Sequence, residues 1–207
     1  MQIEGRVGPA FGQDGVQEPP RLGRTLEVVV GQAHGRYQEA NLRGNVFCAA
    51  NTAAQATSTA SSTATGLILT NPVGSGVILS ILDCAVGVSA VVPAVFTVGL
   101  FSGGPVSTTA VTQTVAITPR NAMIGNGKVG AGLAASSATL PASPVHIRTL
   151  LCSTWITGGT STSMEFAKDE ISGAIALLPG TNVSIQSVVG TQSCISSITW
   201  EELPYTA

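Results

Sequence analysis

The sequence has little charge and few aromatic side chains. Of its 207 residues, 10% are charged and 4% are aromatic, while 44% are hydrophobic. A typical soluble domain is about 25% charged. Ser, Thr, Ala and Gly take the place of the charged residues, so we expect a hydroxyl-rich, nearly neutral surface that other subunits cover in part. The net charge of −2 argues against the basic stripe that nucleic-acid binding needs, so no nucleic-acid partner is predicted.

Cysteine pairs, an export signal and a membrane-spanning helix are also missing. The cysteines are far apart and form no CxxC pair, so neither a zinc site nor a thioredoxin-like motif is predicted: they are Cys48, Cys84, Cys152 and Cys194. The first fifteen residues have no apolar signal core, so we expect four reduced thiols. The most apolar window, residues 77–100, contains Asp83 and Pro93, which favours two strands over a membrane helix.

Side chains for hydrolytic chemistry are scarce. The two histidines, His34 and His146, lie outside any nucleophile motif, and we place His146 at the start of a strand. Trp155 and Trp200 lie in strand-like runs, which favours the core or a subunit contact over a sugar platform. Five carboxylates flank predicted strands and are interpreted as solvated rims: Glu165, Asp169, Glu170, Glu201 and Glu202. The sequence therefore predicts no enzyme and no catalytic, cofactor or metal site.

Two glycine-rich stretches imitate nucleotide-binding motifs. "NPVGSG" at 71–76 lacks the P-loop lysine and precedes a strand-like run, so we expect a loop between two strands. "GNGKVG" at 125–130 satisfies G-x-G-x-x-G, but the residues that follow make a poor helix and no acidic residue occurs before Glu165. We interpret the second stretch as a flexible glycine loop.

Strand-like patterns fill the chain from about residue 45. Residues 111–118 and 183–189 alternate between apolar and polar side chains, whereas residues 77–88 and 94–101 are apolar on both parities, as in strands covered on both sides. Further runs bring the count to about eight or nine short strands: 146–156, 173–178 and 194–202. We therefore expect an all-β fold with one antiparallel sandwich over residues 45–207.

Two stretches have more than one interpretation. Residues 164–178 carry apolar side chains at helical spacing, but Gly173 and Pro179 favour a loop followed by a strand over an amphipathic helix. Residues 49–66 are low-complexity Ala, Ser and Thr. That stretch is either a surface loop or an extended segment that packs against a neighbouring subunit.

The N-terminal part differs from the rest in its chemistry. Residues 1–24 combine three prolines with many glycines and charges, and they show no apolar period, so we expect an extended arm followed by a connecting segment at 25–44. Extended arms bind by wrapping around a partner, although a terminal tail without a role is the alternative. The arm residues that we expect to contact a partner are Arg6, Pro9, Pro19, Pro20, Arg21 and Arg24.

Four stretches together carry a resemblance to a known class of proteins: "GRYQEANLRGNVFCAAN" (35–51), "GLILTNPVGSG" (66–76), residues 120–150, and "KDEISGAIALLPGTNVSIQSVVG" (168–190) with "SITWEELP" (197–204). They resemble structural proteins of tailed bacteriophage virions. Some virion proteins of this kind form compact jelly-roll trimers on the capsid surface as decoration or cement proteins, while others are head spikes or tail components.

The resemblance implies a fold, a role and partners. The fold would be a jelly-roll-like antiparallel sandwich with an N-terminal arm. The role would be a non-enzymatic capsid decoration or cement protein that stabilises the head, assembled in the host bacterial cytoplasm and located in the virion. The partners would be the major capsid protein or other virion proteins and further copies of this chain, a homotrimer being favoured, without a membrane. The alternative role is a receptor- or carbohydrate-binding module of a tail or spike.

Overall fold

The structure is a computed structural model, which describes residues 35–89, 96–103, 106–153 and 166–205. In these ranges the chain forms one short helix, α1 (Gln38–Leu42), and twelve strands. The predicted all-β class is therefore confirmed. The arm at 1–24 lies outside the described residues.

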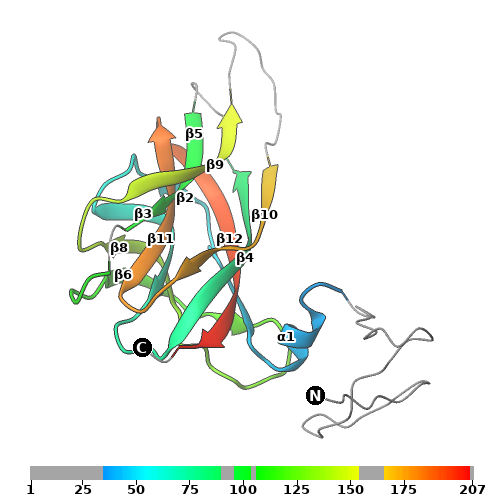
Figure 1. Cartoon of the computed structure of the whole chain (residues 1–207). Helices are drawn as coiled ribbons and strands as arrows, with labels where there is room; N and C mark the ends of the chain where they lie inside the picture. The colour runs from blue at the N-terminus through cyan, green and yellow to red at the C-terminus, as the bar shows by residue number, and fades with distance from the viewer. Residues whose placement is uncertain (1–34, 90–95, 104–105, 154–165, 206–207) are drawn as a thin grey trace, which may run out of the picture. The chain divides into compact units, whose positions relative to one another are not determined.

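Two antiparallel sheets of six strands each contain all of these strands (Figure 1). The first sheet has the order β10-β4-β12-β1-β7, with β2 beside β12. Its strands are β1 (Val46–Ala50), β2 (Gln55–Thr57), β4 (Val77–Val88), β7 (Arg120–Asn121), β10 (Phe166–Leu177) and β12 (Gln192–Pro204). The second sheet has the order β6-β8-β3-β11-β5-β9. Its strands are β3 (Thr63–Asn71), β5 (Phe96–Ser102), β6 (Thr112–Ile117), β8 (Leu133–Thr139), β9 (Val145–Ser153) and β11 (Thr181–Val189).

The pairing of the long strands is that of a jelly roll. Strand β5 pairs with β9, β4 with β10, β3 with β11, and β1 with β12, so the chain is rolled up as one long hairpin. Successive pairs alternate between the two sheets, which produces the two Greek keys of the jelly-roll architecture. Strands β6, β7 and β8 belong to the connection between β5 and β9. The jelly-roll-like sandwich that the sequence suggested is therefore the observed fold.

The core lies between the sheets and follows the period-2 alternation of the strands. Leu79 and Ile81 of β4 and Trp200 of β12 are fully buried and belong to one apolar cluster with residues of the second sheet such as Leu67 and Ile185. Burying a side chain of this size stabilises the fold by about 1.5–3 kcal/mol. The indole of Trp200 also stacks on a phenylalanine, Phe47 of β1, with 6.2 Å between ring centroids. Of the two positions that the sequence left open for Trp200, the core and a subunit contact, the structure shows the core.

A smaller cluster covers the outer face of the second sheet. Ala64 and Ile68 of β3 pack there with residues of β8 and with Leu140, and Val111 lies against them. Strand β3 is therefore buried on both faces, which explains why its sequence, "TATGLILTN", has apolar residues at both parities. By contrast, the second face of β4 is only half-buried, because Ser80, Asp83 and other mostly small residues occupy it. Full coverage of both faces, expected at 77–88, is therefore not what the structure shows.

The sequence left two interpretations for residues 164–178, a helix or a loop followed by a strand. The described part of this stretch matches neither of them. Residues Phe166–Leu177 form the continuous strand β10, whose register against β4 shifts between Glu170 and Ile175. Ser172 has a φ of 53° and Gly173 a φ of 84°, the left-handed conformations of a β-bulge. The inserted residues break the alternation of the strand, so apolar residues fall at helical spacing. The expectation of a loop before residue 173 is therefore wrong.

The low-complexity stretch at 49–66 forms strand contacts within its own chain. Its middle part forms β2, which pairs with β12, and Thr57 is fully buried. Thr59 forms an isolated parallel bridge with Ser187 of β11. Small side chains permit this close approach, which serves the sandwich itself. A simple surface loop is therefore not the correct description, and within the described chain the stretch has an intramolecular role.

The four cysteines are free and differ in exposure: Cys84 and Cys194 are buried, Cys48 is half-buried and Cys152 is exposed. Burial raises the pKa of Cys84 from its ordinary value of 9.0 to about 12, with a further contribution from the nearby Asp83 carboxylate. Burial also raises the pKa of Cys194 to about 11. Both thiols therefore stay protonated in the folded protein at pH values where the unfolded chain ionises them.

We expect the protein to lose stability as the pH rises above 9. Between pH 9 and about 11, the unfolded chain releases protons that the folded protein retains at Cys84 and Cys194, so the free energy of unfolding falls. At pH 10 each thiol should lower it by about 1 kcal/mol relative to pH 7. Urea unfolding at both pH values measures the loss. Between pH 7 and pH 10, the free energy of unfolding of a Cys84→Ala, Cys194→Ala double variant should fall less than that of a Cys152→Ala variant. Equal falls in the two variants would contradict the assignment of the pH dependence to the two buried thiols.

Candidate interaction site at the β7–β8 loop

The side chains that the sequence marked for possible chemistry are dispersed in the structure. His146 is the second residue of β9, as predicted, and its ring lies 5.0 Å from that of Phe101. Within the described ranges no group of three or more His, Cys, Asp and Glu side chains could hold a metal ion, and no helix is long and apolar enough to cross a membrane. The remaining candidates lie outside the described residues: Arg6, Pro9, Pro19, Pro20, Arg21, Arg24, His34, Trp155 and Glu165.

Two of the carboxylates assigned to solvated rims have specific partners instead. Asp169 of β10 accepts two hydrogen bonds from the guanidinium of Arg148 on β9, and the distance from Arg148 Nη2 to Asp169 Oδ1 is 2.9 Å. This pair links β9 and β10, which are edge strands of the two different sheets. Glu202 of β12 is buried, with 8% of its surface exposed. The rim interpretation is therefore wrong for Glu202 and incomplete for Asp169.

Glu202 anchors the loop that joins β7 to β8, residues 122–132, which we call the β7–β8 loop. Its carboxylate accepts the backbone N–H of Ala131 at 3.0 Å and that of Gly132 at 2.9 Å. The indole Nε1 of Trp200 donates to the same carboxylate at 3.3 Å. Three donors compensate for the burial of the carboxylate, which would otherwise be costly. The core residue Trp200 and the loop are thus connected through one side chain.

Glycines occupy the tightly packed positions where the loop meets this carboxylate. A Cβ atom on Gly130 would lie 2.8 Å from Oε1 of Glu202 and 3.0 Å from the ring of Phe47. A Cβ on Gly132 would lie 3.1 Å from the indole nitrogen of Trp200. These glycines let the backbone approach the core closely. Gly130 is the last glycine of the stretch at 125–130 that imitates a dinucleotide fingerprint, and close packing explains why a glycine stands there.

The other end of the loop is tethered as well. The side chain of Asn121 donates to the carbonyl of Gly44 at 2.8 Å and accepts the N–H of Met123 at 2.9 Å. Further along, Lys128 Nζ donates to Asn45 Oδ1 at 2.6 Å, and its backbone N–H donates to Asn126 Oδ1 at 3.0 Å. The glycine loop expected from the sequence is present, and hydrogen bonds along its length tether it in the structure.

This tethered loop displays two apolar side chains to solvent. Ile124 is 90% exposed and Val129 is 88% exposed. Single exposed apolar residues are common, but two almost fully exposed branched side chains on one tethered loop form a candidate contact for a partner protein. Because the loop is already ordered, docking would cost little conformational entropy. We call Ile124 and Val129 the loop tip.

A cleft adjoins the start of the β7–β8 loop at the edges of the two sheets. It has a volume of about 680 Å³ and lies between β1 and β6, with Arg120 of β7 as the one charged residue of its lining. The rest is small, hydroxylated or apolar, for example Ala50, Thr118 and Ser197. Strand β6 pairs only with β8 in the described chain, so its edge at the cleft has open backbone groups. An open strand edge beside a cleft is a site where an extended peptide segment can add as a further strand.

Comparison with known proteins identifies no relative: no family model matches the chain, and neither a curated protein nor a solved structure matches it. The site geometry and the resemblance to virion proteins are therefore the support for a function.

Sequence reasoning missed the loop tip and the anchor. Ile124 and Val129 lie in a Gly/Asn-rich stretch, residues 120–132, which is a weak signal of exposure. Glu202 belongs to a strand whose alternating residues Trp200 and Ile198 face the core, so its parity alone indicated an inward side chain. The position of Glu202 two residues after Trp200 was therefore the signal in the sequence for a buried carboxylate.

Proposed function

We propose that the protein is a non-enzymatic structural protein of a tailed-bacteriophage virion that attaches to the capsid surface as a decoration or cement protein. The sequence resemblance supports the virion, and the jelly-roll-like fold, an architecture shared by many viral capsid domains, is compatible with it. The observation that carries the binding role is the tethered β7–β8 loop with its exposed tip. Its partner is the major capsid protein or another virion protein, and the functional unit is a homo-oligomer, with a trimer favoured.

The carbohydrate-binding alternative has less support. It needs an aromatic side chain at a surface on which a sugar can stack. Trp200 is fully buried in the core, and Trp155 lies outside the described residues. Phe166 at the start of β10 is 69% exposed, but it is not part of the lining of the cleft. The cleft beside β1 and β6 has no aromatic residue in its lining. A glycan-binding screen with the purified protein distinguishes the two roles, since the decoration role requires no glycan.

The proposal predicts that the loop tip carries much of the affinity for the particle. An Ile124→Asp, Val129→Asp variant should bind phage particles that lack the protein at least about 100-fold more weakly, because two apolar side chains of about 1.5 kcal/mol each no longer become buried. Co-sedimentation with particles at increasing protein concentration measures the affinity. The tip side chains are exposed, so the melting temperature should not change.

A matched control tests whether any exposed apolar residue would behave in this way. Val145, at the start of β9, is 61% exposed, and Val145→Asp should leave the affinity within about 3-fold of the original. If the loop-tip variant decorated particles as well as the control did, the loop would not be the contact. Absence of the protein from virions imaged by electron microscopy would refute the virion role itself.

A further inference from the structure

Strand β6 has an open edge without the side chains that usually protect such edges. Within the described ranges it pairs with β8 alone and stands at one end of the second sheet (Figure 1). Native proteins guard open edges with charged side chains or prolines, because the free backbone groups pair readily with another chain. The other strands at the ends of the two sheet orders, β7, β9 and β10, all contain charged residues. Strand β6, "TQTVAI", contains neither a charge nor a proline, which points to a strand partner in the assembled protein.

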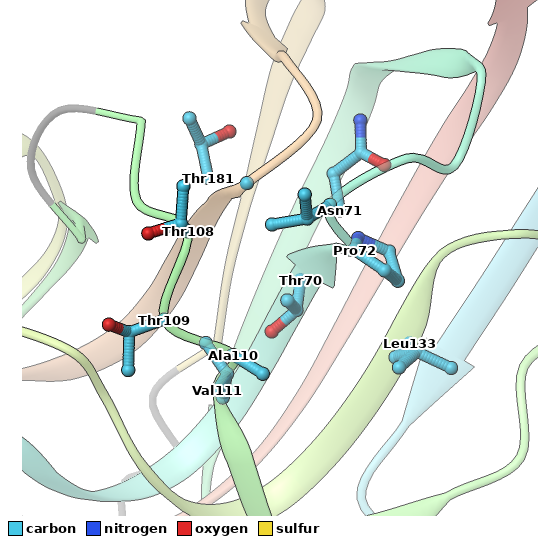
Figure 2. Close-up of a pocket in the computed structure, with 11 residues that line it drawn as sticks. Thr70, Asn71, Pro72, Thr108, Thr109, Ala110, Val111, Leu133 and Thr181 are labelled. Atoms are coloured by element: carbon cyan, nitrogen blue, oxygen red, sulfur yellow. The ribbon is translucent and has the colours of Figure 1, made fainter.

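Strand β6 is firmly held by its own chain, so its edge is preformed. Its two register shifts against β8 cancel, because the pairs at the two ends of the ladder, from Thr112 to Ile117, are in the same register. Figure 2 shows the segment that leads into β6, Thr108 to Val111, on one side of a small cavity of about 190 Å³, with Leu133 of β8 across from it. Val111 packs against the apolar cluster on the outer face of the second sheet. An added strand would therefore meet an ordered backbone, and β6 would lose little conformational entropy.

The cleft beside this edge defines the chemistry of the added segment. Ala49 and Ala50 line it from β1, beyond the two residues at which β1 pairs with β7, and residues 115–118 line it from β6 and its end. Arg120, three positions after the last residue of β6, is exposed and forms no ion pair with a described residue. The cleft therefore suits an extended, mainly apolar segment with a single negative charge at one end.

A segment of this composition occurs in residues 1–34, which lie outside the described residues. Their one continuous apolar run with strand propensity is residues 26–30, "LEVVV", in which Glu27 is the only charged residue and Gly31 follows directly. Five extended residues span about 17 Å, close to the length of about 20 Å of a six-residue strand such as β6. The run therefore matches the open edge in length, in apolar character and in charge.

We propose that residues 26–30 of a second copy of this chain add to β6 as a further antiparallel strand. Glu27 stands near the start of the segment and Arg120 follows the end of β6, so the antiparallel direction brings the opposite charges together and places Val30 beside Val115. When each copy gives one segment and accepts one, the contact is head-to-tail and closes into a ring such as a trimer. The inference rests on the homo-oligomer of the proposed function and identifies the contact that joins its copies.

Two variants of the full chain, one at the edge and one in the segment, test the exchange. Val115→Lys puts a charge on the edge, and Val28→Pro removes an N–H from the added strand. Each variant alone should raise the dissociation constant of the oligomer at least about 10-fold, as measured by sedimentation velocity. A mixture of the two should form a 1:1 complex, because the first offers an intact segment and the second an intact edge. A segment that docked on its own chain would give no such complex.

Matched controls separate this contact from general effects of the substitutions. Val145→Lys, on the exposed start of β9, and Val16→Pro, in the arm, should associate as the original protein does. Val115 is 51% exposed, so Val115→Lys should keep the melting temperature of the original protein.

Charge reversal tests the direction of the added strand. Glu27→Arg and Arg120→Glu should each weaken association about 5-fold, because each brings like charges together. The double variant should recover most of this loss. Absence of recovery would refute the antiparallel register.

The outcomes distinguish this inference from the proposed function. If Val115→Lys and Val28→Pro kept the oligomer of the original protein, or if their mixture formed no complex, the strand exchange would be refuted and the proposed homo-oligomer would need another contact. If the original protein were a monomer, the homo-oligomer of the proposed function would be refuted together with the exchange.

Discussion

Replacing Gly66 by alanine should abolish folding of the protein. Gly66 lies in the middle of β3 with a φ of 127°, where a side chain is strained. A Cβ atom there would lie 2.2 Å from the carbonyl oxygen of Ile185 on β11, which is a backbone atom and cannot swing away. We expect a loss of more than about 4 kcal/mol, a large part of the 5–15 kcal/mol that stabilises a typical domain.

The physical reason is a β-bulge in the middle of the second sheet. The register between β3 and β8 shifts between Thr65 and Ile68, and Gly66 occupies the shift. Strand β3 lies between β8 and β11, so both neighbours would have to move to admit a methyl group. The effect should therefore extend to the whole sandwich and not remain local.

Gly87→Ala on β4 is the matched control for Gly66→Ala. A Cβ atom at Gly87 would have its nearest neighbour, a ring carbon of Phe166, at 3.7 Å, which is an ordinary contact. We expect a change of less than about 1 kcal/mol for this variant. The yield of soluble protein and urea unfolding followed by tryptophan fluorescence measure both effects. A Gly66→Ala protein as stable as the Gly87→Ala protein would show that the bulge tolerates a side chain.

Glu202→Ala should give the second largest effect and should act on both stability and binding. The change leaves the N–H groups of Ala131, Gly132 and Trp200 without their acceptor in a buried position. Since hydrogen bonds to a charged group contribute about 1.5–3 kcal/mol, we expect a loss of roughly 3 kcal/mol or more. Release of the loop should also speed hydrogen exchange at Ala131 and Gly132 and weaken attachment to the particle.

The neighbouring carboxylate is the control for Glu202. Glu201 lies on the opposite face of β12, and Glu201→Ala should change the free energy of unfolding by less than about 0.5 kcal/mol. Glu202→Gln should recover part of the loss, because its remaining carbonyl oxygen accepts one of the N–H groups. If Glu202→Ala matched Glu201→Ala in stability and in hydrogen exchange, the anchor role of the carboxylate would be refuted.

Much of the strand content could be predicted because alternation is a local property. Residues 111–118 and 183–189 correspond to β6 and β11, and the loop at 71–76 joins β3 to β4 as expected. The prediction failed at β10, where the bulge at Ser172 and Gly173 shifts the parity of the strand and produces helical spacing. It was also incomplete for β2, because Ala, Ser and Thr have no strong period and the strand forms only by pairing with β12.

The sequence by itself determined the class of fold, the position of most strands and a surface with little charge, since composition and period-2 alternation depend on near neighbours in the chain. Only the tertiary structure decided which glycine tolerates no side chain and which carboxylate is buried. Glu202 meets Gly132 across 70 positions of sequence, and Gly66 meets Ile185 across an even longer separation. Such contacts arise from how the rolled hairpin brings strands together, so no local pattern encodes them.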